Sequence, residues 1–168
     1  MLYQNLELDP QALPELLKTP FNPHPKRYLR HRFISLFILF GLIGTGVGIS
    51  WMSGNMYLAG SLSLLWLIFL ISFVIFEIKA FPLRGYLVRE HDISYKSGLI
   101  FRDVVTVPYN RIQHSEVSHG PIERMMSLST LKIFTAGGSS SDLAIHGLDP
   151  EEAEKIKEWL TQKAASHV

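Results

Sequence analysis

The stretch FISLFILFGLIGTGVGISWMSGNMYLAGSLSLLWLIFLISFVIF, residues 33–76, contains no charged side chain. A bilayer core about 30 Å thick requires about 20 apolar residues per helical span, so this stretch is long enough to cross a membrane twice. Turn-forming residues interrupt it at Ser53, Gly54 and Asn55. The sequence therefore predicts a transmembrane helix over residues 33–53, a second one over residues 56–76, and a tight turn between them.

Two other interpretations of this stretch are a pair of buried core helices and a cleaved signal peptide. A chain of 168 residues has too little surrounding protein to bury so long an uncharged segment. A signal peptide is disfavoured because the apolar run begins late, exceeds a normal signal core and is followed at once by a second span. The sequence therefore favours the membrane hairpin over both alternatives.

Basic residues flank the apolar stretch on both sides, whereas the predicted turn carries no charge. By the positive-inside rule, both ends of the chain lie in the cytoplasm, so residues 1–32 form a cytoplasmic N-terminal segment. The same cations either contact anionic lipid headgroups, where each would add about 1 kcal/mol of attraction, or serve only as topology signals. The candidate headgroup contacts are Lys26, Arg27, Arg30, Arg32, Lys79 and Arg84.

Small residues recur in the first predicted span, with Gly44 and Gly48 in GxxxG spacing. Such residues let two helix backbones approach closely. The spacing favours packing of the hairpin on itself, and dimerisation through the same glycines is the alternative.

The composition excludes several classes of function. The chain is 47% hydrophobic and 18% charged with a formal net charge of +1, so nothing in it suggests a nucleic-acid partner. It contains no cysteine, which removes disulfide frameworks, thiolate metal sites and cysteine nucleophiles together.

After residue 82 the apolar pattern changes to a period of two, which is typical of half-buried strands. The strand candidates are residues 85–90, 92–98, 99–107, 111–117, 130–136 and 143–148. Ser97-Gly98 is a hairpin-turn signal. Asp149, Pro150 and Glu152 form a helix start that is similar to a capping box. Many short strands and one final helix predict a small barrel or sandwich over residues 83–164.

Two segments, VPYNRIQHSEVSHGPIERMMSLSTLKIFTAGG (residues 107–138) and IHGLDPEEAEKIKEWL (residues 145–160), resemble the bacterial pleckstrin-homology-like family often called membrane-flanked domains. The match covers about half the chain, and the two preceding spans are typical of short members. One position departs from the pattern, because Ser127 precedes Leu128 where members usually have glycine. The matching positions are Pro108, Arg111, Ile112, Gln113, Gly120, Pro121, Arg124, Thr135, Ala136, Gly137, Gly147 and Leu148.

The resemblance implies a seven-stranded, strongly bent barrel closed by a C-terminal α-helix, with the seventh strand coming from a split of residues 99–107. Together with the orientation given by the basic flanks, it predicts a multi-pass protein of the bacterial cytoplasmic (inner) membrane whose folded domain and termini are cytoplasmic. Domains of this type commonly serve as binding platforms that use a strand edge or a loop end. The resemblance connects some members with envelope stress or with immunity to membrane-active peptides.

The segment RIQHSEVSHGPIERMM, residues 111–126, has the inventory of a metal or acid–base site. His114 and Glu116 share a strand face, but His119 falls on the other face, and no spacing brings three ligands together. The chain has no GxSxG nucleophile elbow, no Walker loop and no Rossmann fingerprint in a suitable setting. We therefore predict no catalytic, cofactor-binding or metal-binding residue, and enzyme activity is not supported.

The structural interpretation of the same segment is a polar corner of the barrel. Gly120-Pro121 marks a sharp change of direction, and Pro121 would open a single helical turn. The arginines would donate hydrogen bonds to carbonyls around this turn, and Glu123 would pair with either of them. The candidate interaction or structural corner consists of Arg111, Gln113, Gly120, Pro121, Glu123 and Arg124.

These observations predict a non-catalytic interaction or scaffold protein within a membrane complex. The expected partners are membrane lipids and another membrane protein, for example one with several similar domains, or a second copy of this chain. The first alternative is a module that binds lipid headgroups, although the hairpin REHDISYKSG, residues 89–98, has no lysine cluster to clamp phosphates. The more distant alternative is a metal-dependent enzyme.

Overall fold

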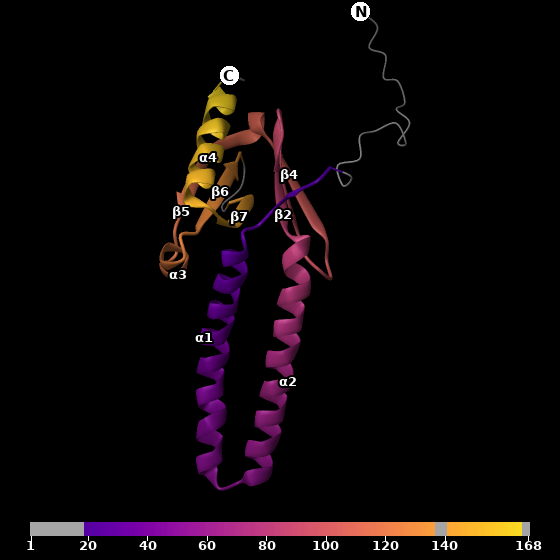
Figure 1. Cartoon of the computed structure of the whole chain (residues 1–168), viewed down its shortest axis with the longest axis vertical. Helices are drawn as coiled ribbons and strands as arrows, with labels where there is room; N and C mark the ends of the chain where they lie inside the picture. Colours follow the sequence, from indigo (N-terminus) through magenta and orange to yellow (C-terminus); the bar gives the residue numbers. More distant parts are fainter. Residues whose placement is uncertain (1–18, 137–140, 166–168) are drawn as a thin grey trace, which may run out of the picture.

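A computed structural model describes residues 19–136 and 141–165 of the chain. Two long antiparallel helices form a stalk, and a small antiparallel-sheet domain lies at one end of it (Figure 1). Helix α1 spans Lys26–Ser50 and helix α2 spans Met56–Ala80, with the 3-10 turn η3, Trp51–Ser53, after α1. Both helices extend past the apolar spans predicted at residues 33–53 and 56–76, so their domain ends carry charged residues. Most of the predicted N-terminal segment, residues 1–18, lies outside the described residues.

The turn of the hairpin lies where the sequence places it. Gly54 has a φ of 76°, a left-handed conformation that favours glycine. The Asn55 side chain caps α2 by accepting a hydrogen bond of 3.1 Å from the backbone N–H of Leu58. Only 6% of the most apolar part of each helix is buried within the protein. The stalk therefore presents its apolar side chains outward, as helices in lipid do and core helices do not.

The predicted packing of small residues within the hairpin is seen at one glycine of the pair. A Cβ at Gly44 would lie 3.3 Å from the Trp66 ring, and the Trp66 indole N–H donates a 3.1 Å hydrogen bond to the carbonyl of Phe40. At Gly48 a Cβ would meet nothing within 4 Å. Gly44 thus makes room for Trp66, whereas Gly48 lies beside a gap that is also lined by Ser63 and Trp66 of α2, and no side chain fills the space next to it.

The first sheet is antiparallel, with strand order β1-β2-β3-β4. Its strands are β1 Asn22–Pro23, β2 Gly85–Val88, β3 Asp92–Ser97 and β4 Asp103–Pro108. The short 3-10 turn η4, Phe81–Leu83, connects α2 to β2. The predicted source of a seventh strand is wrong. Residues 99–107 do not split, because residues 98–102 form the β3–β4 loop, and the additional strand is β1, from before α1.

The second sheet has strand order β5-β6-β7. The 3-10 turn η5, Tyr109–Arg111, leads into β5, Ile112–Ser118. Helix α3, Pro121–Met125, separates β5 from β6, Ser129–Thr135, and β7 is Leu143–Leu148. Helix α4, Pro150–Ala165, ends the described chain.

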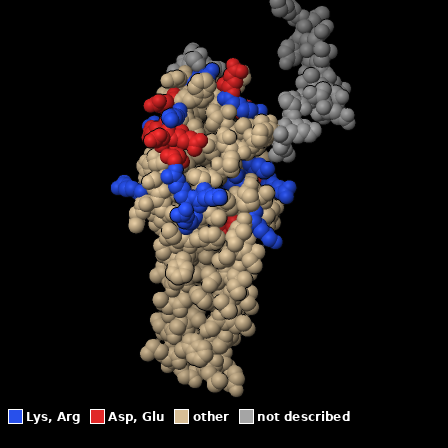
Figure 2. Space-filling model, in the orientation of Figure 1, with Lys and Arg blue, Asp and Glu red and all other residues tan. Residues whose placement is uncertain are grey.

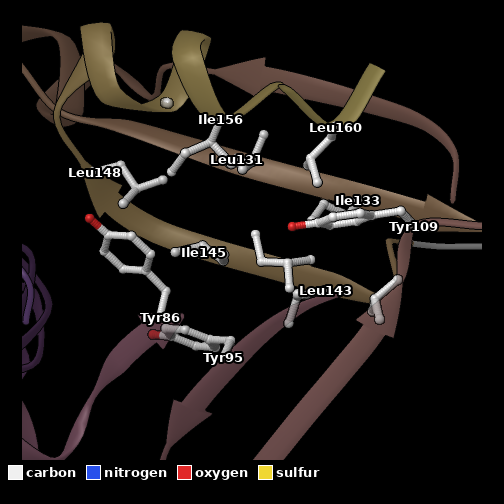
Figure 3. Close-up of a cluster of buried hydrophobic side chains, with 13 residues drawn as sticks. Tyr86, Tyr95, Tyr109, Leu131, Ile133, Leu143, Ile145, Leu148, Ile156 and Leu160 are labelled. Carbon is white, nitrogen blue, oxygen red and sulfur yellow. The ribbon is translucent and has the colours of Figure 1, made fainter. Parts of the chain in front are cut away.

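Both sheets and α4 contribute side chains to one hydrophobic core (Figure 3). Ile93 and Val107 come from the first sheet, Ile133 and Ile145 from the second, and Leu160 from α4. Burial of each such aliphatic side chain contributes about 1.5–3 kcal/mol. Helix α4 is therefore held by the core. Closure of a barrel by this helix stays a prediction, since the described hydrogen bonds form two separate sheets.

Candidate functional site

Glu77, at the end of α2, is the centre of an ion cluster between the stalk and the domain. Its carboxylate is 3% exposed and accepts hydrogen bonds from two arginines. Arg84 donates from its two terminal nitrogens, at 2.5 and 3.3 Å. Arg32 of α1 donates from Nε at 3.0 Å and from Nη2 at 3.2 Å. The cluster therefore joins both helices to the segment that enters β2.

Sequence reasoning missed Glu77. The available signal was its position, since it is the first charged residue after the uncharged stretch and lies among basic flanks. An acidic residue at the end of a membrane helix requires a partner, because an unpaired buried charge is costly. One of the two arginines that pair with it comes later in the sequence and the other comes earlier, and both are too far away in the sequence for a local pattern to reveal them.

A second set of contacts fixes the domain on α1. Tyr28 is 5% exposed, and its ring occupies the space that a side chain at Gly147 would need. His24 lies just before α1, with its ring centroid 5.0 Å from that of Tyr28 and 5.8 Å from that of Tyr95. Burial, followed by the positive charge of Arg84, lowers the pKa of the His24 imidazole from 6.5 to about 4. His24 is therefore neutral at physiological pH.

An ion pair also joins the start of α1 to the start of α4, where the Arg27 guanidinium contacts the Asp149 carboxylate. Together with the Glu77 cluster, it changes the interpretation of the predicted headgroup contacts. Arg84 was expected at the lipid headgroups, but its side chain is only 12% exposed against Glu77, so this expectation is wrong. Of the remaining candidates, Lys26, Arg30, Arg32 and Lys79 are exposed, and Arg32 is bound to Glu77. Figure 2 shows a band of Lys and Arg where the apolar stalk meets the domain.

The polar corner contains a small hydrogen-bond network around Glu123, which is 9% exposed. Its carboxylate accepts from the backbone N–H of Gly120 at 2.8 Å and from the Thr130 hydroxyl at 2.7 Å. Thr130 also lies 3.0 Å from Nδ1 of His146, whose pKa is lowered by burial. The predicted pairing of Glu123 with an arginine is wrong, since its two oxygens are occupied by these donors and the two corner arginines, Arg111 and Arg124, are exposed. Pro121 opens α3 as predicted.

The turn after α3 retains the geometry that glycine would favour, although it carries serine. Ser127 has a φ of 51°, and among the described residues it is the one non-glycine with a positive φ. The N–H of Ser127 donates to the carbonyl of Arg124 at 3.3 Å, and that of Leu128 donates to the carbonyl of Glu123 at 2.8 Å. This pair of bonds is a Schellman motif, whose left-handed position is usually glycine.

A groove of about 400 Å³ lies between β5 and α4. We refer to it as the β5–α4 groove, and it is lined by Ile112, Gln113, His114, Ser115, Leu160, Thr161 and Ala164. Strand β5 is an edge strand, and its register with β6 shifts between Ile112 and His114, which leaves Gln113 in a bulge. The His114 ring stacks on Phe134 with 4.3 Å between centroids, which packs this wall of the groove against β6. Bulges of this kind re-aim side chains at strand edges.

The structure thus separates the residues that were predicted to form one corner. Gly120, Pro121, Glu123 and Arg124 lie together at α3, with the Arg124 side chain exposed, whereas Gln113 lies in the groove and Arg111 is exposed at the end of η5. His114 and Glu116 do share a face, with 3.8 Å between Nε2 and Oε1, while Nδ1 of His119 lies 3.1 Å from the carbonyl of Leu128. Within residues 19–136 and 141–165, no group of three or more His, Cys, Asp or Glu could hold a metal ion.

An apolar two-helix stalk that carries a small two-sheet domain with a C-terminal helix defines the class of this protein, a membrane protein with a pleckstrin-homology-like domain. The family model described as the bacterial PH domain matches residues 34–164, and the chain belongs to this family. The resemblance stated from the motifs is therefore confirmed.

The relatives are transmembrane proteins by name. The chain is 30% identical over 138 residues to the UPF0699 transmembrane protein YdbS of Bacillus subtilis (strain 168), which covers 81% of this chain and 84% of that protein. It is also 30% identical over 81 residues to the UPF0699 transmembrane protein YdbT of the same organism, covering 48% of this chain and 16% of that protein.

A crystal structure of a DUF1696 family protein with a pleckstrin-homology domain, from Shewanella loihica PV-4, is similar over 48% of this chain and 70% of that one. The sequence identity is 17% and the TM-score is 0.37, so this similarity carries no argument about function.

Proposed function

We propose that this protein is a non-catalytic, membrane-anchored interaction module whose β5–α4 groove binds an extended segment of another membrane protein. The observation that carries the proposal is the groove itself, which combines an edge strand with a helix wall. Among the described residues β5 pairs only with β6, so its other edge is available for backbone pairing with an added strand.

The lining of the groove suits a peptide rather than a reaction. Ala164 offers an apolar contact from α4, where the core residue Leu160 forms the floor, while Gln113 and Thr161 offer hydrogen-bonding groups from the two walls. A few polar groups in an otherwise apolar groove fix the orientation of a bound segment. Among the residues that line the groove, His114 is the one ionisable group; its ring is stacked on Phe134, and no carboxylate or second histidine lines the groove beside it, as acid–base catalysis would favour.

The attachment of the domain to the two stalk helices supports a role at the membrane. The Glu77 cluster and the Arg27–Asp149 pair join the domain to both stalk helices, so the groove keeps a constant height and direction relative to the hairpin. A partner segment that emerges from the same membrane would then meet the groove at high effective concentration. We propose that the protein lies in a bacterial inner membrane with the domain and both termini on the cytoplasmic side, because basic residues flank the hairpin on that side and the turn carries no charge.

The proposed partner is a longer membrane protein with similar domains. Support comes from Bacillus subtilis, which holds a relative of about this length and a longer relative of which the match covers 16%. A complex of this kind would brace the envelope, and envelope stress or immunity to membrane-active peptides is the biological context that we propose for it.

Photo-crosslinking in native membranes tests this function. A photoreactive residue at Gln113 of the full chain should capture a specific membrane protein, whereas the same residue at Glu158, on the exposed side of α4, should not. Thr161→Trp, which fills the groove, should abolish the capture, and Thr161→Ser should preserve it. Equal capture from Gln113 and Glu158, or capture that survives a folded Thr161→Trp variant, contradicts the proposal. Capture of a second copy of this chain would show that the groove forms a contact within a homo-oligomer.

Headgroup binding is a second candidate, favoured by the exposed basic band at the neck of the molecule (Figure 2). Lys26, Arg30 and Lys79 would provide this attraction. The full chain in vesicles rich in anionic lipid should then be more stable than in zwitterionic vesicles, and the difference should disappear at high salt. A Lys26→Gln/Arg30→Gln/Lys79→Gln variant that keeps the difference would exclude this candidate.

A further inference from the structure

The β3–β4 loop, residues 98–102, exposes two large apolar side chains to the surroundings. Ile100 is 73% exposed and Phe101 is 79% exposed, although the domain buries most of its other large apolar residues. The loop has a defined shape, because Gly98 has a φ of 97° and lies against the backbone of Phe101 too closely for any side chain. A specific turn thus keeps the apolar tip of this loop exposed.

The strand register determines where this tip lies. Strand β2 begins at Gly85, directly after the end of α2, so Gly85 marks the end of the sheet that is nearer to the stalk. Gly85 pairs with Lys96, and Ser97 pairs with Asp103, so the loop continues past the beginning of β2 toward the stalk. At about 3.3 Å per residue, the tip lies on the order of 10 Å closer to the stalk than Gly85.

That distance brings the tip to the edge of the apolar stalk. Residues 77–83 rise by about 1.5 Å each in α2 and about 2 Å each in η4, which amounts to a similar length. The tip is therefore level with the last turn of α2, beside the end of the apolar span. Figure 1 shows the β3–β4 hairpin descending alongside the domain end of α2.

Helix α3 places a second apolar tip, formed by Met125, at the same end of the domain. Met125 is 86% exposed, and Figure 1 shows α3 beside α1 at the height where the stalk meets the domain. An arginine adjoins each apolar tip in the sequence, Arg102 next to Phe101 and Arg124 next to Met125, and both are exposed. An apolar or aromatic side chain with a neighbouring cation is the arrangement that favours a bilayer interface, since the cation can reach the headgroups.

We propose that Ile100, Phe101 and Met125 insert into the interface of the bilayer that the hairpin crosses, and that Arg102 and Arg124 contact its headgroups. The bilayer is the binding partner of these tips because they lie at the level where the apolar stalk ends, and the stalk is already in contact with lipid. The domain would then rest on the membrane at points on two sides of the stalk, in addition to its covalent connection. This inference does not depend on a partner in the β5–α4 groove.

Depth-dependent quenching in vesicles tests the proposal with the full chain, which has no cysteine of its own. A polarity-sensitive fluorophore at Phe101→Cys or Met125→Cys should emit at shorter wavelength than one at Lys155→Cys, an exposed control on α4. Lipids that carry a nitroxide near the headgroup should quench the first two probes and leave the control unchanged. A probe at position 101 that is as accessible to water and as weakly quenched as the control overturns the proposal.

Hydrogen exchange of the unlabelled chain removes any effect of the label. In vesicles, the backbone amides of residues 99–102 should exchange more slowly than in a lipid-free amphipathic polymer, and Ile100→Ser/Phe101→Ser should abolish this difference while the β2 and β3 amides stay protected. Equal exchange in both environments for the wild-type loop contradicts membrane insertion. Quenching at position 101 that is absent while the proposed partner is still captured at Gln113 would refute this inference and leave the proposed function standing.

Discussion

The carboxylate of Glu77, at the end of α2, accepts hydrogen bonds from both terminal nitrogens of Arg84, at the entrance to the sheet domain. This contact spans the η4 turn and makes the domain a direct continuation of the membrane helix. Arg32 binds the same carboxylate from α1, so one acidic side chain holds three segments together. The most informative substitutions lie at this junction.

Glu77→Gln should destabilise the full chain by about 2–4 kcal/mol, because it leaves two guanidinium groups near each other without their counter-ion. Arg32 is 43% exposed, so water compensates part of the loss and keeps the effect below that of a fully buried pair. Thermal unfolding in mild detergent measures it. Glu90→Gln, at an exposed carboxylate, is the matched control, and an unchanged melting temperature for Glu77→Gln would show that the cluster contributes nothing to stability.

Gly147→Ala should destabilise the domain by about 2 kcal/mol or more. Gly147 has a φ of 72°, which strains any residue with a Cβ, and the Tyr28 ring fills the space where that Cβ would lie. In a double-mutant cycle, Tyr28→Ala should reduce the cost of Gly147→Ala, since it removes the overlap and leaves only the backbone strain. Strict additivity of the two changes would argue against this contact.

Ser127→Gly should stabilise the protein by about 1 kcal/mol, because it relieves the left-handed strain at φ 51° in the Schellman motif after α3. Ser127→Ala keeps a Cβ at the same position and should leave the stability close to that of the wild type. The midpoints of chemical denaturation compare the three proteins. A destabilised glycine variant would indicate that the serine side chain makes a compensating contact.

Stability should decrease as the pH falls from about 6.5 to about 4. The buried His24 has a folded-state pKa of about 4, against an ordinary value of 6.5 that applies in the unfolded chain, so protons bind the unfolded chain preferentially in this window. For His24 alone the loss reaches roughly 2 kcal/mol at pH 5, and His146, whose pKa is also lowered by burial, acts in the same direction. His24→Phe should flatten the profile of unfolding free energy against pH, whereas His91→Phe, at an exposed histidine, should not. A wild-type stability that is constant over this range would contradict the burial of a neutral His24.

The predicted topology can be measured with single cysteines in the cysteine-free chain. A membrane-impermeant maleimide should label Ser53→Cys, in the hairpin turn, in intact spheroplasts. It should label Glu158→Cys, on α4, only after the membrane is opened, because the basic flanks predict a cytoplasmic domain. The reverse pattern would place the domain outside and would invalidate the orientation.

The boundary between what could and could not be predicted is clear at the polar corner. Pro121 and Gly120 signalled α3 through local backbone preferences, which a single sequence displays directly. The partners of Glu123 did not follow, because an arginine one residue away is a plausible partner by charge, whereas Thr130 becomes one only when β6 folds back beneath α3. Gln113 likewise belongs to a groove whose other wall, α4, comes from the end of the chain.

By itself the sequence determined the hairpin, the alternation of most strands and the start of the last helix. Each of these follows from neighbouring residues, since apolar length, a period of two and capping chemistry are local properties. Only the tertiary structure decided that β1 from before α1 joins the sheet, that Glu77 is the counter-ion of Arg32 and Arg84, and that Tyr28 packs on Gly147. These contacts unite segments separated by a membrane hairpin or by the whole domain, and their free energy depends on distances that arise only when the chain has folded.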